Sequence, residues 1–296
     1  MKKNHHLLLG AHMSVAGGYE QALIKGNSIG CTAIQLFTKS NRQWKAKAIT
    51  AQQAALFKYT AKELAINSIV SHASYLINLG NTDAELTKKS VVALIEELER
   101  CTLLGIPYLV LHPGSSGKIT QEESLTHVSA CLNYVLNYDS GSTMILLENT
   151  AGQGSSVGSS FEELKAIYKG VTHKKRIGFC FDTCHALVAG YDFRTPSLYT
   201  ILWEQFDAII GLEHLKVFHL NDAAKDLNSH VDRHAHIGKG KIGLEGFKLI
   251  MNDPRFFDIP KILETPKTTT DLKHDLENLE ILRSLLTKKT KTALGL

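Results

Sequence analysis

The stretches L-V-L-H (109–112), I-L-L-E (145–148) and F-C-F-D (179–182) decide the fold of this chain. In each, a short apolar run ends in a side chain that can bind a metal ion. The pattern occurs eight times, with the polar residue at His12, Gln35, His72, His112, Glu148, Asp182, His219 and Glu264. The intervals of 23 to 45 residues leave room for one strand, one helix and two loops. The pattern therefore predicts an α/β protein, a (β/α)8 TIM barrel with long βα loops at its C-terminal rim.

Size and composition favour one intracellular domain. The chain has 296 residues, 44% of them hydrophobic and 21% charged, so we expect a single TIM-barrel domain over residues 1–296. Its five cysteines are odd in number and form no C-x-x-C pair, which indicates a reducing compartment. The apolar run behind the basic N-terminus is too short for a signal peptide, and no stretch could span a bilayer. We therefore expect a cytoplasmic protein, with a monomer as the default.

Segments of helical period separate the apolar runs. T-Q-E-E (120–123) and S-F-E-E (160–163) are capping-box patterns. Residues 83–104 predict an outer helix whose solvated face carries Lys88, Lys89, Glu96, Glu97 and Arg100. Long loops are expected at residues 38–47, 73–82, 113–118, 149–159 and 221–243, all on one rim. The basic end, residues 287–296, is expected to be frayed.

Histidines and carboxylates at the expected rim form a set suited to metal ions: His72, His112, Glu148, Asp182, His185, His219, Asp232, His234 and Glu264. Nine ligands are too many for one ion and suit two or three, because zinc takes about four donors. Imidazole and carboxylate without thiolate favour Zn or Mn. In D-T-C-H (182–185) the aspartate ends a strand and the histidine follows three residues later, so the two side chains can face neighbouring ions. In D-R-H (232–234) the spacing of two puts both side chains on one side of an extended segment.

Other candidate residues have an ordinary explanation. His12 is expected to support the ligands from behind, and the remaining histidines to be surface or supporting groups: His5, His6, His127, His173, His214, His230, His236 and His274. Cys180 and Cys184 flank Asp182, but thiolates would make a closed structural site, so we expect small core residues.

Three loops have compositions suited to nucleic acid. The loop K-S-N-R-Q-W-K (39–45) interleaves cations with an aromatic residue, which suits phosphates and bases or sugars, although an ordinary solvated loop has the same composition. Tyr75, Leu76 and Ile77 lie just past His72, where apolar residues either wedge into DNA or pack on their own domain. The glycine-rich segment 149–156 would allow close approach to a phosphate, which alone is a weak signal.

Several motifs together resemble the endonuclease IV family of zinc-dependent apurinic/apyrimidinic endonucleases. They are F-T-K-S-N-R-Q-W (37–44), S-H-A-S-Y-L-I-N-L-G (71–80), L-H-P-G-S (111–115), L-E-N-T-A-G-Q-G-S-S-V-G (147–158), F-D-T-C-H-A-L-V-A-G-Y-D (181–192), H-L-N-D (219–222), V-D-R-H-A-H-I-G-K-G-K-I-G (231–243) and I-L-E-T-P (262–266). The resemblance runs from Gly10 to about Leu282 and includes all nine candidate ligands.

The resemblance implies a trinuclear zinc cluster, with Mn²⁺ possible at one or more positions. His72 and His112 would hold one zinc, with Glu148 bridging to a second that Asp182, His219 and Glu264 complete; His185, Asp232 and His234 would hold the third. Arg42, Tyr75 and Leu76 match the family positions that enter the DNA minor groove.

The implied reaction is hydrolysis of the phosphodiester 5′ to an abasic site in double-stranded DNA by a metal-bridging hydroxide. It would leave a 3′-hydroxyl and a 5′-deoxyribose phosphate, and the enzyme would also remove 3′-blocking groups. Flipping out a nucleotide that has lost its base costs less than flipping a normal one, which would supply selectivity.

Two other functional classes remain open at this point. A sugar isomerase or epimerase uses the same barrel and similar ligands, but it needs fewer of them and gives Asp232, His234 and the 39–47 loop no role. A binder of damaged DNA with structural zinc would recognise the lesion without cleaving it, which fits poorly with ligands at an open rim.

Overall fold

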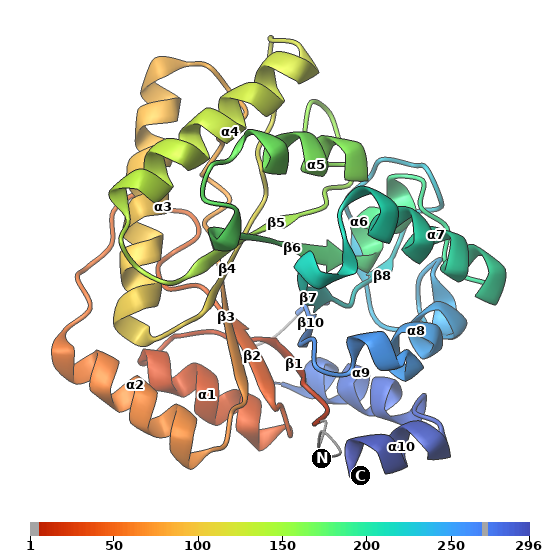
Figure 1. The fold of residues 1–296 in the computed structure, drawn as a ribbon. Helices are drawn as coiled ribbons and strands as arrows, with labels where there is room; N and C mark the ends of the chain where they lie inside the picture. Colours follow the sequence, from red (N-terminus) through yellow and green to blue (C-terminus); the bar gives the residue numbers. More distant parts are fainter. Residues whose placement is uncertain (1–5, 268–271) are drawn as a thin grey trace.

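Eight parallel strands close into a barrel in the order β1-β10-β7-β6-β5-β4-β3-β2 (Figure 1). The computed structural model describes residues 6–267 and 272–296. The barrel strands are β1 (Leu9–His12), β2 (Ala33–Leu36), β3 (Ser68–His72), β4 (Tyr108–Leu111), β5 (Met144–Glu148), β6 (Ile177–Asp182), β7 (Leu215–His219) and β10 (Lys261–Leu263). Each apolar run of the sequence is a strand of this barrel, so the predicted TIM-barrel fold is confirmed.

Helices surround the strands (Figure 1). They are α1 (Tyr19–Ser28), α2 (Ala51–Glu63), α3 (Ala84–Leu104), α4 (Gln121–Tyr138), α5 (Phe161–Gly170), α6 (Thr183–Val188), α7 (Pro196–Ile209), α8 (Gly243–Asn252), α9 (Lys273–Ser284) and α10 (Lys288–Leu294), with short 3-10 turns at Lys174–Arg176, Leu212–His214 and Pro254–Phe256. Within the described residues, no helix has both the length and the apolar character needed to cross a membrane.

The predicted helix starts are largely those observed. Thr120 and Glu123 form a complete capping box at α4, each side chain accepting from the other residue's backbone N–H. Ser160 caps α5, but the Glu163 carboxylate turns back to the N–H groups of Gly158 and Ser159, so that capping box is only half formed. Glu163 thereby fixes the end of the loop that follows β5.

Two layers of side chains fill the barrel and its surroundings. The interior is packed by one buried residue from each of seven strands: Ala33, Val70, Val110, Leu146, Cys180, Val217 and Ile262. The alternate residues, such as Ile34, Ile145 and Leu147, pack outward against the helices. Because side chains alternate along a strand, the residue two places after each interior residue also points inward, at the C-terminal mouth.

The C-terminal residues differ from expectation. Residues 287–296 are not a frayed tail, since helix α10 begins after the cap Thr287 and ends before Gly295, which has a φ of +71°. Leu294 is 2% exposed and Thr290 is buried. The segment is polar in composition, but Leu294 supplies an apolar anchor and Asn252 accepts a hydrogen bond from the Thr287 N–H.

The face of α3 also differs from expectation. Glu97 and Arg100 are not solvated: they are 1% and 4% exposed, whereas their neighbour Glu99 is exposed. Burial is possible because loops after β2 and β3 cover this face and provide hydrogen-bonding partners for both charged groups.

Candidate metal centre

The C-terminal mouth of the barrel collects the residues that end the apolar runs. They follow the interior layer by two positions and are Gln35, His72, His112, Glu148, Asp182, His219 and Glu264, joined by His12 of β1. Glu148, Asp182 and His219 are fully buried at the floor, whereas the side chains of His112 and Asp232 are 30% and 43% exposed. The centre therefore has a closed floor and an open rim.

A first group of possible ligands consists of His72, His112 and Glu148. The Glu148 Oε2 atom lies 3.2 Å from His72 Nε2 and 3.0 Å from His112 Nε2. The other ring nitrogen of His72, Nδ1, lies 2.7 Å from the Ala73 carbonyl oxygen. A proton on Nδ1 would leave Nε2 free to bind a cation.

A second group consists of Glu148, Asp182, His219 and Glu264. His219 Nδ1 lies 2.9 Å from Glu148 Oε1 and 3.1 Å from Glu264 Oε2. Glu148 therefore offers one oxygen to each of the first two groups and is placed to bridge them. Asn221 supports this group, donating to Asp182 Oδ2 and accepting from the Glu264 N–H.

The third group is His185, Asp232 and His234. Asp182 caps helix α6 by accepting from the His185 N–H, and the His185 ring lies between two carboxylates, with Nδ1 3.8 Å from Asp182 Oδ1 and Nε2 3.2 Å from Asp232 Oδ1. His234 begins β9 (His234–Ala235), which pairs with β8 (Asp222–Ala223) within the long loop after β7. Asp232 lies two residues before His234, so the pairing of β9 with β8 fixes the segment that carries both side chains.

The ring nitrogens of this third group that face Asp232 fit a cation. Nε2 of His185 and Nε2 of His234 are buried and make no hydrogen bond within residues 6–267 and 272–296. Their Nδ1 atoms face the carbonyl oxygens of Asn149 and Glu264, at 2.9 and 3.1 Å. Asp232 Oδ1 lies 3.2 Å from His185 Nε2 and 3.5 Å from His234 Nε2, so these three atoms converge on one point, where a bound metal ion would contact all of them.

The charges of the centre are mutually stabilised. Burial alone would raise the pKa of Glu148, but His219 and His112 hold it well below its usual range. Burial would likewise raise the pKa of Asp232, but His185 and His234 lower it to about 2. Both carboxylates are therefore ionised at neutral pH, as metal ligands must be.

Sequence reasoning missed Gln35, which connects several ligands. Gln35 Oε1 lies 2.8 Å from His219 Nε2, and Gln35 Nε2 donates to Glu264 Oε1 at 2.6 Å and lies 3.0 Å from His12 Nδ1. His12 Nδ1 itself lies 3.5 Å from Glu264 Oε1, so His12 contacts one of the candidate ligands. The available signal was that Gln35 occupies the same strand-end position as the ligands.

The two cysteines near Asp182 behave as protonated core residues. Burial raises the pKa of the Cys180 thiol to about 12, and it also moves that of Cys184 above its usual range. Cys180 lies in the interior layer, and Cys184 donates to the Arg233 carbonyl oxygen. Both cysteines belong to groups of side chains that could hold a metal ion, but burial favours the protonated thiol over the thiolate that a metal ligand requires.

The predicted DNA-contacting residues lie beside the centre. Arg42 is exposed in the loop after β2, and Tyr75 is 56% exposed, with its ring centroid 5.3 Å from that of His72. Leu76 is half-buried, whereas Ile77 is buried and packs on its own domain. Tyr75, His112, His185 and Asp232 line a cavity of about 420 Å³ that opens at the rim.

Histidines outside the nine lie apart from these groups or support loops. His127 contacts the Leu79 carbonyl oxygen, His173 contacts Asn137, and His230 contacts the Ala151 carbonyl oxygen. The His236 and His274 rings lie 4.8 Å apart at a tilt of 51°, and His214 lies beside Tyr168. His6 is exposed, and His5 lies outside the described residues.

Comparisons with known proteins agree with this architecture. A family model described as a xylose isomerase-like TIM barrel matches residues 25–285. A curated protein from Chloroflexus aggregans, named "Probable endonuclease 4", is 48% identical over 278 residues, which cover 94% of this chain and 97% of that protein. The crystal structure of endonuclease IV from Thermus thermophilus is 38% identical, covers 94% of this chain and 98% of that one, and superposes with a TM-score of 0.81.

A more distant structure shares the fold alone. A D-tagatose 3-epimerase-like protein superposes with a TM-score of 0.69 at 18% identity, covering 93% of this chain and 96% of that one. Sequence identity distinguishes the two structures, at 38% for the endonuclease IV and 18% for the epimerase-like protein. The resemblance drawn from the sequence motifs is therefore confirmed, and the chain belongs to the endonuclease 4 family.

Proposed function

We propose that this chain hydrolyses the phosphodiester 5′ to an abasic site in double-stranded DNA, leaving a 3′-hydroxyl and a 5′-deoxyribose phosphate. As a member of the endonuclease 4 family it is a deoxyribonuclease of the apurinic/apyrimidinic endonuclease type that acts in DNA repair. The nine side chains at the barrel mouth are its proposed metal ligands, and Glu148 is the proposed bridging residue.

Three zinc ions are the proposed cofactors, with Mn²⁺ able to replace zinc at one or more positions. His72, His112 and Glu148 would hold the first; Glu148, Asp182, His219 and Glu264 the second; His185, Asp232 and His234 the third. When bound, zinc supplies a water nucleophile at neutral pH and stabilises the negative charge of the phosphoryl transition state.

The chain's own residues prepare the site for a lesion. The ionised Glu148 and Asp232 hold the candidate ligand histidines in place through contacts of 2.9 to 3.5 Å. The cavity of about 420 Å³ beside His112 and Asp232 is suited to a sugar and phosphate turned out of the helix. Arg42, Tyr75 and Leu76 would enter the minor groove and hold the opened duplex.

The single observation that supports this function best is the third ligand group. A sugar epimerase of this fold needs the ligands of one or two ions, and it has no use for a rim group in which the Nε2 atoms of His185 and His234 converge on Asp232. A binder with purely structural zinc does not need ligands that line an open cavity.

We further propose that the enzyme removes blocking groups held through a 3′-phosphate, because their hydrolysis breaks the same bond, between the 3′ oxygen and phosphorus, and leaves the same 3′-hydroxyl. It would act as a monomer in the cytoplasm.

The test compares the wild type with Glu148→Gln on a labelled duplex carrying one abasic-site analogue. The wild type should cut on the 5′ side, leave an end that a polymerase extends, and contain about three zinc ions per chain. Glu148→Gln should lose the bridging charge and the cleavage while retaining the folded barrel. Full cleavage by this variant, or turnover of sugars by a wild type that leaves the duplex intact, would contradict the proposal.

A further inference from the structure

Helix α3 carries two buried charged residues, Glu97 and Arg100, that lie three positions apart and face two rim loops. The first loop, residues 38–47, follows β2 and carries Arg42; the second, residues 73–82, follows β3 and carries Tyr75. Residues 38–47 contain no helix or strand. The position of this loop therefore depends on side-chain contacts.

Glu97 touches both loops. Its Oε2 atom accepts a hydrogen bond from the Thr38 hydroxyl at 2.6 Å, and its Oε1 atom accepts from the Ser74 backbone N–H at 3.3 Å. Thr38 starts the first loop, and Ser74 immediately precedes Tyr75 in the second. One fully buried carboxylate thus fixes a point in each loop.

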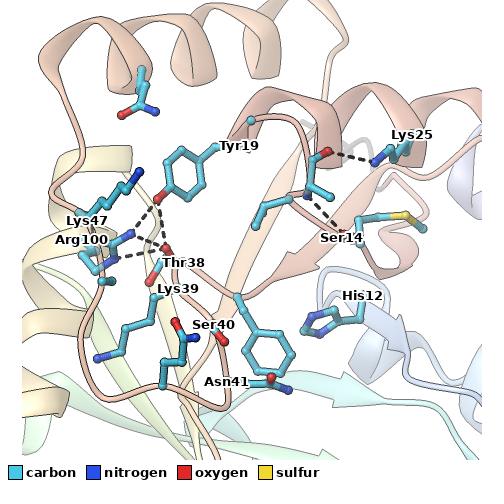
Figure 2. A pocket seen from close by; sticks show the side chains of 18 of the residues that line it. His12, Ser14, Tyr19, Lys25, Thr38, Lys39, Ser40, Asn41, Lys47 and Arg100 are labelled. Atoms are coloured by element: carbon cyan, nitrogen blue, oxygen red, sulfur yellow. Dashed lines mark hydrogen bonds between the residues drawn. The ribbon is translucent and has the colours of Figure 1, made fainter. Parts of the chain in front are cut away.

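Arg100 holds the two ends of the first loop together. Its Nε atom donates to the Thr38 carbonyl oxygen at 3.1 Å, and its Nη1 atom donates to the Lys47 carbonyl oxygen at 2.8 Å. Its Nη2 atom donates to the Tyr19 hydroxyl oxygen at 2.6 Å. Figure 2 shows this guanidinium between Tyr19 and Thr38, in the wall of a cavity of about 920 Å³.

The loops also touch each other next to the proposed DNA-contacting residues. The Ser74 hydroxyl donates to the Asn41 carbonyl oxygen at 3.0 Å, so the residues bonded to each other directly precede Tyr75 and Arg42. The Tyr75 ring in turn lies 5.7 Å from that of Phe37, at the end of β2. A shift of either loop end would therefore change the spacing between Arg42 and Tyr75.

We propose that Glu97 and Arg100 are positioning residues that set the spacing between the Arg42 loop and the Tyr75 loop, and through it the preference for damaged over intact DNA. This rests on the proposed function, since it assumes that both loops contact the lesion. Buried charged groups are expensive unless their hydrogen bonds are made, and such a network holds one arrangement of the groups that it joins. Here the arrangement held is that of two loops at a substrate surface.

The first test replaces the buried carboxylate. Glu97→Ala removes both contacts and should lower the ratio of affinities for abasic and intact duplex about tenfold, the size expected for a lost buried charged hydrogen bond. Glu97→Gln should recover most of the ratio, because an amide can accept from the Ser74 N–H and donate to the Thr38 oxygen. Glu99→Ala, on the exposed side of α3, is the matched control and should change nothing.

Further measurements separate positioning from general damage to the fold. Zinc content should be unchanged in Glu97→Ala, since the hydrogen bonds of the Glu97 carboxylate in the described residues are to Thr38 and Ser74, neither of which is a proposed ligand. In the double variant Glu97→Ala with Tyr75→Ala, the affinity ratio should fall by less than the product of the two single fold-changes, because both substitutions act through the Tyr75 ring. If Glu97→Ala does not fold, Thr38→Val removes one of its hydrogen bonds and should shift the ratio in the same direction.

Hydrogen exchange keeps the inference testable without DNA. Thr38→Val should speed backbone exchange in its own loop and also in residues 74–79 of the other loop. Arg100→Lys should speed exchange in residues 38–47, because a lysine ammonium cannot hydrogen-bond to the Thr38 and Lys47 carbonyl oxygens together as the planar guanidinium does. Unchanged exchange in both loops, or an unchanged affinity ratio in Glu97→Ala, would overturn the inference. If the wild type does not cut the abasic duplex, the proposed function fails, and hydrogen exchange alone decides whether the two loops are coupled.

Discussion

The Gln35 side-chain oxygen lies 2.8 Å from His219 Nε2, so His219 is set to donate through Nε2 and to present Nδ1 to Glu148 and Glu264. This is the reverse of His72, whose Nδ1 lies against a backbone carbonyl oxygen. One neutral amide thereby selects which nitrogen of a fully buried histidine faces the proposed metal centre.

Gln35→Ala is expected to weaken metal retention. Without the amide, His219 can adopt the other tautomer and Glu264 loses a hydrogen-bond donor, so zinc affinity should fall about tenfold or more. Competition with a chelator measures this directly. Gln205→Ala, which removes an exposed amide from α7, is the control, and equal zinc affinity in both variants would show that Gln35 does not orient His219.

Tyr75→Ala is expected to weaken binding to abasic duplex by more than it weakens binding to intact duplex. The ring is 56% exposed beside His72 and His112, where it can enter a widened groove. Equilibrium binding of the two duplexes at one salt concentration gives the ratio. Tyr138→Ala, which removes a ring 66% exposed on α4, should leave both affinities intact. An equal loss of affinity for both duplexes would mean that Tyr75 only packs within its own domain and does not recognise the lesion.

Leu294→Ala is expected to lower the free energy of unfolding by about 2 kcal/mol, because it removes the apolar anchor of α10 from a site that is 2% exposed. Leu296 is 66% exposed, two residues later, and its replacement by Ala should change stability by less than about 0.5 kcal/mol. Urea denaturation compares the two. An equally small effect of both substitutions would mean that residues 287–296 are frayed in solution and that Leu294 does not anchor α10.

Lys261 is expected to make stability depend on pH. Burial lowers the pKa of Lys261 to about 7, and its Nζ atom donates to the carbonyl oxygens of Phe256 and Ile259. Between pH 7 and the unfolded value of about 10.4, the unfolded chain binds one more proton than the folded chain, so stability rises with pH.

Lys261→Met lacks this titration. The free energy of unfolding of the wild type, minus that of the variant, should therefore increase by about 1 kcal/mol per pH unit from pH 7.5 to 9.5. Parallel profiles for the two proteins would mean that Lys261 has an ordinary pKa in the folded state.

The sequence predicts the barrel well because each strand combines two signals, an apolar run and a polar last residue. Val110 and His112, or Leu146 and Glu148, are two apart and therefore share the inner side of the barrel. Six of the candidate ligands lie at strand ends and meet for the same reason, and His185 joins them because Asp182 caps the helix that carries it. Asp232 and His234 come instead from the long loop after β7, where β9 pairs with β8.

Features that depend on tertiary partners could not be predicted. Glu97 and Arg100 follow the charge pattern of a solvated helix face, and only the loops over that face make their burial possible. Residues 287–296 are too polar to predict a packed helix, and Leu294 finds its apolar surroundings only in the folded chain. Gln35 shares the strand-end position of the candidate ligands, but its contacts with His219 and Glu264 join different strands and exist only in the folded barrel.

The most direct test of the proposed metal-dependent incision is cleavage of a duplex with one abasic-site analogue, before and after prolonged chelation and after zinc is added back. Incision on the 5′ side that disappears on chelation and returns with zinc is the predicted result. Incision that persists after zinc has been removed to below one ion per chain, or binding to the lesion without any incision by the zinc-loaded protein, would contradict it.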